Sequence, residues 1–206
     1  MTEGSSSHFH APSERTAVRI RLRTPVSDDG RPVFLAGNFN QWRANDEAHR
    51  MAHTGPGQYE FTFPKDAILP RQLEYKYLRG GWDQVETDRY GNPVQNRTLR
   101  LQESREQSDT VERWLTDGKA YREQFLPRIE IISHDFEMPA LVKTRRVAAL
   151  LPHDYHNSDK RYPVLYLQDG QNLFDDYAPF GSWGVDKRLA LMAEQGFGDL
   201  IIIAID

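Results

Sequence analysis

Two apolar runs near the end of the chain constrain the fold more than any other feature. Residues 164–167 lead into a polar loop that contains a glycine, and residues 200–205 form the second run. Apolar runs of this length are typical of strands that are buried on both faces of a sheet. Between them, residues 186–195 have apolar positions at helical spacing, and Gly196 is well placed as the C-cap. The sequence therefore predicts a β-α-β unit of an α/β sheet.

Upstream of this unit, residues 129–133 and 146–151 are predicted to form an antiparallel strand pair. A turn at Met138-Pro139 joins them, and Pro152 closes the second strand. With the last strand of the chain at 200–205, we expect an unpaired sheet edge there. Residues 128–206 are therefore expected to aggregate or to stay partly molten.

The earlier part of the chain shows a different period. Apolar and polar residues alternate at 18–23, 59–63 and 73–77, which is typical of strands with one wet face. Further short strands are predicted at 33–36, 82–86, 98–101 and 110–115. With Gly- and Pro-rich turns between them, these segments predict an antiparallel, immunoglobulin-like β-sandwich that folds on its own, with Trp114 in its core.

The predicted organisation has four parts. A disordered tail over residues 1–14 precedes the sandwich over 15–116, a charged linker over 117–127, and the α/β domain over 128–206. His8 and His10 lie in the Ser-rich tail and are assigned to disordered chain rather than to a metal site.

Composition excludes several classes of function. The 206 residues include 26 basic and 30 acidic ones, a net charge of -4 with no basic block, so nucleic acid and membrane are not expected as partners. The chain has no cysteine, which excludes thiol catalysis and disulfides. No apolar signal segment is visible near the start, so the sequence predicts a cytoplasmic protein. The oligomeric state is left open.

The first half carries the strings VFLAGNFNQW, at residues 33–42, and EYKYLRGGW, at 74–82. Over about residues 17–101 it resembles a starch- or glycogen-binding module, such as the glycogen-binding domain of the AMP-activated kinase β subunit. The resemblance implies an α-glucan or another carbohydrate as partner. It assigns sugar contacts to Trp42, Trp82, Lys76 and Asn96.

The chemistry of these residue types fits sugar binding. The C–H face of a sugar packs on an aromatic ring, and its hydroxyl groups need fixed donors and acceptors. The alternative is a docking module that shapes a neighbouring catalytic cleft without binding sugar.

The second half carries YPVLYLQDGQNLFDD, at residues 162–176, and LIIIAID, at 200–206. From about residue 128 it resembles the first third of the Putative esterase family of α/β-hydrolases, which includes enterochelin-esterase-like and carbohydrate-esterase-like proteins. The resemblance implies hydrolysis of carboxylic esters by a Ser-His-Asp/Glu triad without a cofactor. In this fold the loop after the third strand gives one backbone N–H to the oxyanion hole, which here assigns a donor near Gly170 or Gln171.

The remaining catalytic groups are not found in the sequence. The fold requires a G-x-S-x-G nucleophile followed by an acid and a histidine. The string at Gly181–Gly184 does not have this spacing, and His134, His153 and His156 all precede any such nucleophile. The chain as given is therefore interpreted as an inactive fragment of an esterase.

Two other interpretations compete with the esterase. A calcium site at Asp169, Asp175 and Asp176 is disfavoured because the D-x-D-x-D-G spacing is absent, so no metal is expected. A glycoside hydrolase would need two opposed carboxylates, and residues after 128 do not resemble one. The main alternative is a non-catalytic glucan-binding or scaffold protein.

Overall fold

The computed structural model describes residues 16–25, 30–178 and 180–206. The predicted tail over residues 1–14, with His8 and His10, lies outside the described residues. The chain divides into two compact units. The first comprises the described residues up to Gly80 together with Gln95–Val111, and the second comprises Gly81–Val94 together with Glu112–Asp206.

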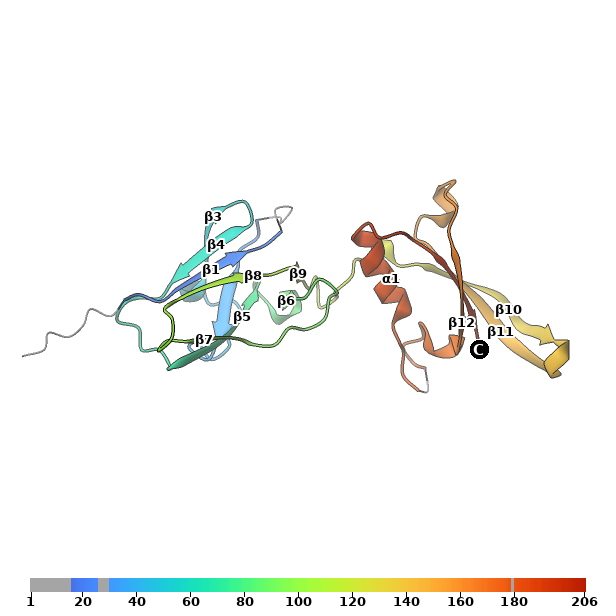
Figure 1. The fold of residues 1–206 in the computed structure, drawn as a ribbon, viewed down its shortest axis with the longest axis horizontal. Coiled ribbons are helices and arrows are strands. Elements are labelled where there is room, and N and C mark those ends of the chain that lie inside the picture. Colours follow the sequence, from blue (N-terminus) through green and yellow to red (C-terminus); the bar gives the residue numbers. More distant parts are fainter. Residues whose placement is uncertain (1–15, 26–29, 179) are drawn as a thin grey trace, which may run out of the picture. The chain divides into compact units, whose positions relative to one another are not determined.

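The first unit contains two β-sheets (Figure 1). One has four strands in the order β3-β4-β1-β8, and the other has three in the order β2-β5-β7. The bounds are β1 Arg19–Arg23, β2 Phe34–Gly37, β3 Ala52–Gly55, β4 Gln58–Thr62, β5 Gln72–Leu78, β7 Arg97–Arg100 and β8 Glu106–Thr110. A 3-10 helix, Glu47–His49, lies between β2 and β3.

The alternation in the sequence decides which side chains are buried in this unit. Leu73, Tyr75 and Tyr77 of β5 are completely buried, as are Ile20 and Leu22 of β1. Each strand thus gives every second residue to the core. Burying one large apolar side chain contributes about 1.5–3 kcal/mol, so these positions dominate the stability of the unit.

A buried carboxylate joins the two sheets. The hydroxyl groups of Tyr75 and Tyr77 in β5 both donate to Asp109 Oδ2 in β8, each at 2.7 Å. Arg97 Nη1 lies 3.1 Å from Asp109 Oδ1, and Gln107 Nε2 donates to the same oxygen at 2.9 Å. Burial raises the pKa of both tyrosines. Asp109 is therefore a fully hydrogen-bonded buried charge that fixes one sheet against the other.

The sandwich prediction is correct in outline and wrong in three details. Strand β1 pairs with β4 antiparallel but with β8 parallel, so the sheets are not all antiparallel. The predicted strand at 82–86 begins instead as a 3-10 helix, Trp82–Gln84. Trp114, predicted in the sandwich core, is only half-buried and lies in the second unit. The immunoglobulin-like classification of this unit stays a prediction.

The second unit contains a small and a larger sheet. Strands β6 (Glu86–Thr87) and β9 (Arg113–Trp114) pair antiparallel. The larger sheet has the order β10-β11-β13-β12. Its bounds are β10 Arg128–Met138, β11 Lys143–Leu151, β12 Val164–Gln168 and β13 Ile201–Ile205. Further 3-10 helices are Glu123–Phe125, Pro139–Leu141, Tyr155–Asn157 and Gly170–Asn172.

The larger sheet confirms the predicted β, β, β-α-β order (Figure 1). Strands β10, β11 and β13 pair antiparallel in sequence, and β12 pairs with β13 parallel. The crossover between β12 and β13 contains helix α1 (Val185–Glu194). Gly196 follows the helix with φ 75°, and its N–H donates to Ala193 C=O at 3.0 Å, as expected for a C-capping glycine. No helix among the described residues is long and apolar enough to cross a membrane.

Burial in this sheet differs from the prediction. Strand β13 alternates between buried and half-buried residues, but Val164, Leu165 and Tyr166 of β12 are 45–68% exposed. The unpaired edge therefore belongs to β12, because β13 lies between β11 and β12. The prediction that β12 is buried on both faces and that β13 forms the edge is wrong for this structure.

The unit boundaries also differ from the predicted ones. Residues 81–94 and 112–116, assigned from sequence to the sandwich, group with the second unit. The pairing of β6 with β9 and the hydrogen bonds of residues 89–92 to α1 hold them there. The predicted borders at 116 and 127 therefore do not coincide with the compact units.

Candidate functional site

The loop that follows β12, residues 169–173, is the candidate catalytic feature of the second unit. Asp169 leaves the strand in the left-handed conformation, with φ 57° and ψ 42°, and begins the 3-10 helix Gly170–Asn172. This conformation is uncommon for a residue other than glycine and is concentrated at functional sites. Residues 169–173 are called the 169–173 loop below.

Gly170 lies directly against the end of β13. A Cβ at this position would come within 2.8 Å of Asp206 Oδ1, 3.0 Å of Ile205 N and 3.1 Å of the Ala204 carbonyl carbon. Two of these three atoms belong to the backbone, which cannot rotate away as a side chain can. Only glycine allows the loop to approach the sheet this closely.

Two backbone hydrogen bonds close the first turn of the loop. Asn172 N–H donates to Asp169 C=O at 2.9 Å, and Leu173 N–H donates to Gly170 C=O at 3.2 Å. The first N–H groups of a helix have no partner within the helix, which here concerns Gly170 and Gln171. These are the two positions that the sequence assigned to the oxyanion hole.

Apolar packing and backbone hydrogen bonds both fix the loop. Leu173 is fully buried in a cluster with Leu150 and Ile202 of the sheet. Trp183 N–H donates to Asn172 C=O at 2.7 Å, and Val185 N–H donates to Leu173 C=O at 2.8 Å. The start of α1 is therefore hydrogen-bonded to the 169–173 loop.

Three buried oxygens near this loop lack a hydrogen-bond partner among the described residues. They are Gln171 Oε1, Asn172 Oδ1 and Asp186 Oδ1. Burial raises the pKa of Asp186, and the backbone N–H of Lys187 opposes this only in part. Unpartnered buried acceptors are costly and are often retained for a functional reason.

Asp206 and Arg146 form an ion pair beside Gly170. Arg146 Nε lies 2.8 Å from Asp206 Oδ2 and its Nη2 lies 3.2 Å from Oδ1, a two-pronged geometry. Asp206 N–H also donates to Arg146 C=O at 3.1 Å. The pair fixes the carboxylate that limits the space at Gly170.

Ser182, His134 and His156 are among the residues that the sequence analysis excluded from the triad. Ser182 lies in the segment before α1, where its Oγ accepts from Gly184 N–H at 3.2 Å. His134 is exposed on β10, and His156 Nε2 is 2.9 Å from Glu130 Oε1. Their exclusion from the triad stays a prediction.

One group of side chains has the donor types of a metal site. One ligand atom each of His153, Asp154 and Asp199 lie within 4.8 Å of one another. Lys160 Nζ already donates to Asp154 Oδ2 at 2.5 Å, and Tyr162 donates to its other oxygen at 2.9 Å. Both carboxylate oxygens of Asp154 therefore already accept hydrogen bonds from protein side chains.

Three of the four predicted sugar-contact residues lie near the same position along the strands of the β2-β5-β7 sheet. Lys76 of β5 pairs with Ala36 of β2, and Asn96 directly precedes Arg97, the partner of Tyr75. Trp42 N–H donates to the carbonyl of Gly37, the residue after Ala36, at 2.9 Å. The turn that carries Trp42 holds it with φ 59°. Asn96 is exposed, and Trp42 and Lys76 are half-buried.

Trp82, the fourth predicted sugar-contact residue, belongs to the second unit. It begins the 3-10 helix Trp82–Gln84 and is 45% exposed. Of the strand predicted at 82–86, only Glu86 lies in a strand, as the first residue of β6.

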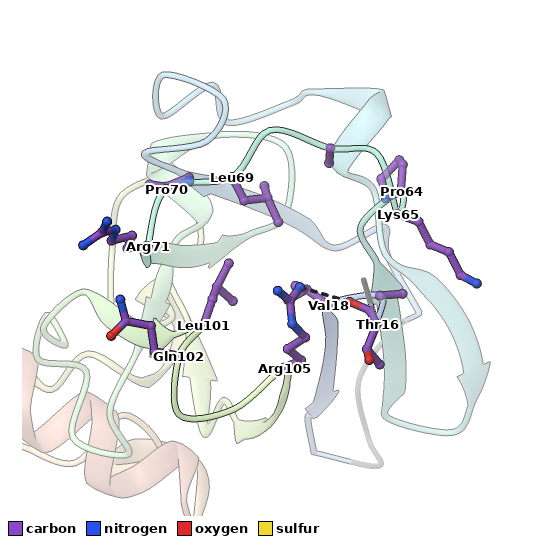
Figure 2. A pocket seen from close by; sticks show the side chains of 12 residues that line it. Thr16, Val18, Pro64, Lys65, Leu69, Pro70, Arg71, Leu101, Gln102 and Arg105 are labelled. Carbon is purple, nitrogen blue, oxygen red and sulfur yellow. Dashed lines mark hydrogen bonds between the residues drawn. The ribbon is translucent and has the colours of Figure 1, made fainter. Parts of the chain in front are cut away.

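A hollow of about 270 Å³ lies at another part of the first unit, between residues 64–71 and 101–105. Figure 2 shows Arg105 directed into it, while Arg71 and Lys65 extend outward from its rim. Arg105 Nη1 donates to Thr16 C=O at 3.0 Å. The predicted sugar-contact residues are not part of its lining.

A family model supports the interpretation of the second unit. Residues 139–206 match the family described as Putative esterase. This range contains β12, the 169–173 loop, α1 and β13. The C-terminal part of the chain is therefore esterase-like.

Two curated relatives match part of the chain. An amylopullulanase of Thermoanaerobacter thermohydrosulfuricus is 38% identical over 104 residues, which are 48% of this chain and 7% of the relative. An alpha-amylase of Niallia circulans is 37% identical over 84 residues, which are 40% of this chain and 6% of the relative. The chain spans less than a tenth of the length of these relatives.

Two solved structures align over most of the chain. They are the ferric enterobactin esterase of Salmonella typhimurium, at 16% identity with a TM-score of 0.28, and the enterobactin esterase of Shigella flexneri, at 12% identity with a TM-score of 0.26. Each alignment covers 92% of this chain, and 53% and 50% of the two structures. At such TM-scores the superpositions add nothing to the sheet order described above.

Sequence analysis missed the polar residues that support the loop. Arg146 lies in a strand that reads as apolar from its second residue onward, and Asp206 is the last residue. Neither position belongs to a periodic pattern. Only the sheet order, which places β11 beside β13, brings them together.

Proposed function

We propose that the second unit is the front of an α/β-hydrolase domain that hydrolyses carboxylic esters with a serine nucleophile. In this proposal the N–H of Gly170 or Gln171 donates to the oxyanion that develops at the ester carbonyl. Other residues supply the nucleophile, the acid and the histidine. Residues 181–184 do not have the spacing of the nucleophile motif, and His134, His153 and His156 do not have the required chain order.

The observation that carries the proposal is the position of Gly170. It packs against β13 and begins a 3-10 helix at the carboxyl end of the two parallel strands β12 and β13. The carboxyl ends of parallel strands are where α/β sheets bind ligands. The match of residues 139–206 to an esterase family supports the same assignment. A fixed backbone donor of this kind lowers the barrier of acyl transfer by about 3–4 kcal/mol.

The test uses the full-length protein that contains these residues. We expect it to hydrolyse p-nitrophenyl acetate or butyrate and to be labelled by a fluorophosphonate probe, which reacts with an activated serine. The 206-residue chain alone is expected to give neither signal. Turnover without labelling, or labelling within residues 16–206, would overturn the proposed mechanism.

We further propose that the first unit binds an α-glucan through Trp42, Lys76 and Asn96. The register of β2, β5 and β7, together with the amylase-type relatives, favours this proposal. Trp82 is retained as a separate candidate because it lies in the other unit. The alternatives are a module that only docks and a protein that binds glucan without any hydrolysis.

Affinity electrophoresis of the chain through gels containing amylose or glycogen tests glucan binding. We expect retardation that is lost in Trp42→Ala, and Trp82→Ala tests the separate candidate. Phe136→Ala is the matched control, because it removes an aromatic ring of β10 that is 50% exposed. A wild-type chain that is not retarded would leave docking as the role of the unit. Retardation without esterase activity of the full-length protein would favour the non-catalytic alternative.

A further inference from the structure

Residues 88–92 form a tight loop of the second unit that the sequence places within the predicted sandwich. Asp88 Oδ1 accepts from Tyr90 N–H at 2.9 Å and from Asn92 N–H at 2.8 Å, and Asp88 Oδ2 accepts from Asn92 Nδ2 at 2.9 Å. Burial alone would raise the pKa of Asp88, but these hydrogen bonds and the charge of Arg188 hold it below its ordinary value. The loop therefore has one defined shape, closed by an ionised carboxylate.

One face of α1 binds this loop. Arg188 donates from Nη1 to Tyr90 C=O at 2.7 Å and from Nη2 to Asn92 Oδ1 at 2.8 Å. Two turns further along, just after the helix, Gln195 Nε2 donates to Arg89 C=O at 2.6 Å. Residues seven apart lie on the same side of a helix, so the two contacts hold α1 along most of its length.

A second group of contacts secures the end of the helix. Glu194 accepts from Arg113 Nη2 at 2.6 Å and from Arg122 Nε at 3.1 Å, and its side chain is 13% exposed. A Cβ on Gly91 would come within 2.5 Å of Ala120 Cβ, so the chain segments are closely packed here. Residues 112–123 therefore hold α1 together with residues 81–94.

The other end of α1 is bound to the 169–173 loop. The N–H groups of Trp183 and Val185 donate to Asn172 and Leu173, and Val185 packs against the core cluster that contains Leu173. Any shift of α1 therefore moves the acceptors of these bonds. A displacement of about 1 Å at a catalytic group can cost about 100-fold in rate.

We infer that residues 81–94 and 112–123 form a clamp on α1 that positions the 169–173 loop, with Arg188 as its central positioning residue. The planar guanidinium makes both contacts at once, which a lysine cannot reproduce. The effect of the clamp on catalysis rests on the proposed function, whereas its effect on the loop does not.

Amide hydrogen exchange of the 206-residue chain tests the clamp without any assay of activity. In Arg188→Ala we expect exchange about tenfold faster in α1 and in the 169–173 loop, because opening of this region becomes easier. Arg188→Lys should be intermediate. Strand β5 serves as the internal reference for folding. Asn92→Ala removes one of the two acceptors of the Arg188 guanidinium, so we expect a smaller increase of the exchange rate in the same peptides.

Arg100→Ala is the control, because the exposed Arg100 side chain contacts Gln72 and Glu103 of the first unit. If exchange in the 169–173 loop is unchanged in Arg188→Ala, or changes equally in Arg100→Ala, the clamp does not position the loop.

The kinetic arm uses the full-length protein. We expect kcat for Arg188→Ala to fall by about 10–100-fold while KM stays within about twofold, with partial recovery in Arg188→Lys. Faster exchange with unchanged kcat would overturn the positioning role. If the wild type does not hydrolyse esters at all, the proposed function fails, and the exchange experiment alone decides on the clamp.

Discussion

Gly170 occupies a position at which any side chain would collide with the sheet. We predict that Gly170→Ala destabilises the protein by about 1–3 kcal/mol, because its Cβ would have to displace the backbone of β13 or move the loop away. The measurement is urea unfolding of the protein, followed by intrinsic tryptophan fluorescence.

Gly198→Ala is the matched control for this prediction. A Cβ on Gly198 would meet no atom within 4 Å, and its φ is not in the left-handed region. We expect that change to be neutral or to stabilise by up to about 1 kcal/mol. Equal effects of the two substitutions would show that the 169–173 loop is not packed against β13 as described.

Asp186 carries a prediction about pH. Burial raises its pKa in the folded state above the unfolded value of about 3.9. Ionisation of Asp186 therefore costs stability above the folded pKa, and the cost disappears as pH falls below the unfolded pKa.

We expect Asp186→Asn to be more stable than the wild type at pH 7, with a difference that shrinks toward pH 4. Chemical denaturation at both pH values measures it, and Asp135→Asn, at an exposed carboxylate, should show no such trend. A difference that grows on acidification would contradict the assignment.

The sequence predicts the role of some residues and not of others. Gly170 and Gln171 could be assigned because a family motif and a strand end point to the same loop. Arg188, Asn92 and Glu194 could not, since their partners lie up to 98 residues away and no local period marks them. A contact of that kind becomes visible only when the topology is known.

At the scale of elements, β12 is an edge strand of the larger sheet. Its consecutive apolar residues Val164, Leu165 and Tyr166 are largely exposed on a strand with one free side. Such an edge is a template for pairing with another chain.

We predict that Val164→Lys slows aggregation of the 206-residue chain, while its unfolding free energy stays within about 0.5 kcal/mol of the wild type. Light scattering during incubation measures the effect. Ile68→Lys removes an equally apolar but isolated residue, 98% exposed, and should leave aggregation unchanged. Equal aggregation of Val164→Lys and the wild type would assign the process to another surface.

Elements with a strong period were predictable and those held by distant partners were not. The strands β1, β4 and β5 follow from alternation, helix α1 follows from helical spacing, and β13 follows from a continuous apolar run. The parallel pairing of β8 with β1 has no local signal, because residues 106–110 are all polar. The helix at Trp82–Gln84 arises because the chain turns toward β9 rather than continuing along the sandwich.

At the scale of the whole molecule, the compact units are not the predicted consecutive segments. Residues 81–94 interrupt the sandwich sequence and fold with the second unit, held by β9 and by α1. Composition changes sharply near residue 128, so a boundary there is the natural expectation from sequence. The contacts of 81–94 have no compositional signature and shift the structural boundary.

The central claim is that a backbone N–H of the 169–173 loop stabilises the oxyanion of ester hydrolysis. The most direct test is kcat of the full-length protein carrying Gln171→Pro, with Gln171→Ala as control. Proline is tolerated in the first turn of a helix and removes only the N–H, and the preceding glycine has no Cβ to oppose the ring.

If the Gln171 N–H is the donor, kcat falls by about 100–1,000-fold in Gln171→Pro and stays near the wild-type value in Gln171→Ala. Full activity in Gln171→Pro would contradict the claim for Gln171. It would leave only the N–H of Gly170, where no substitution separates loss of the donor from collision with β13.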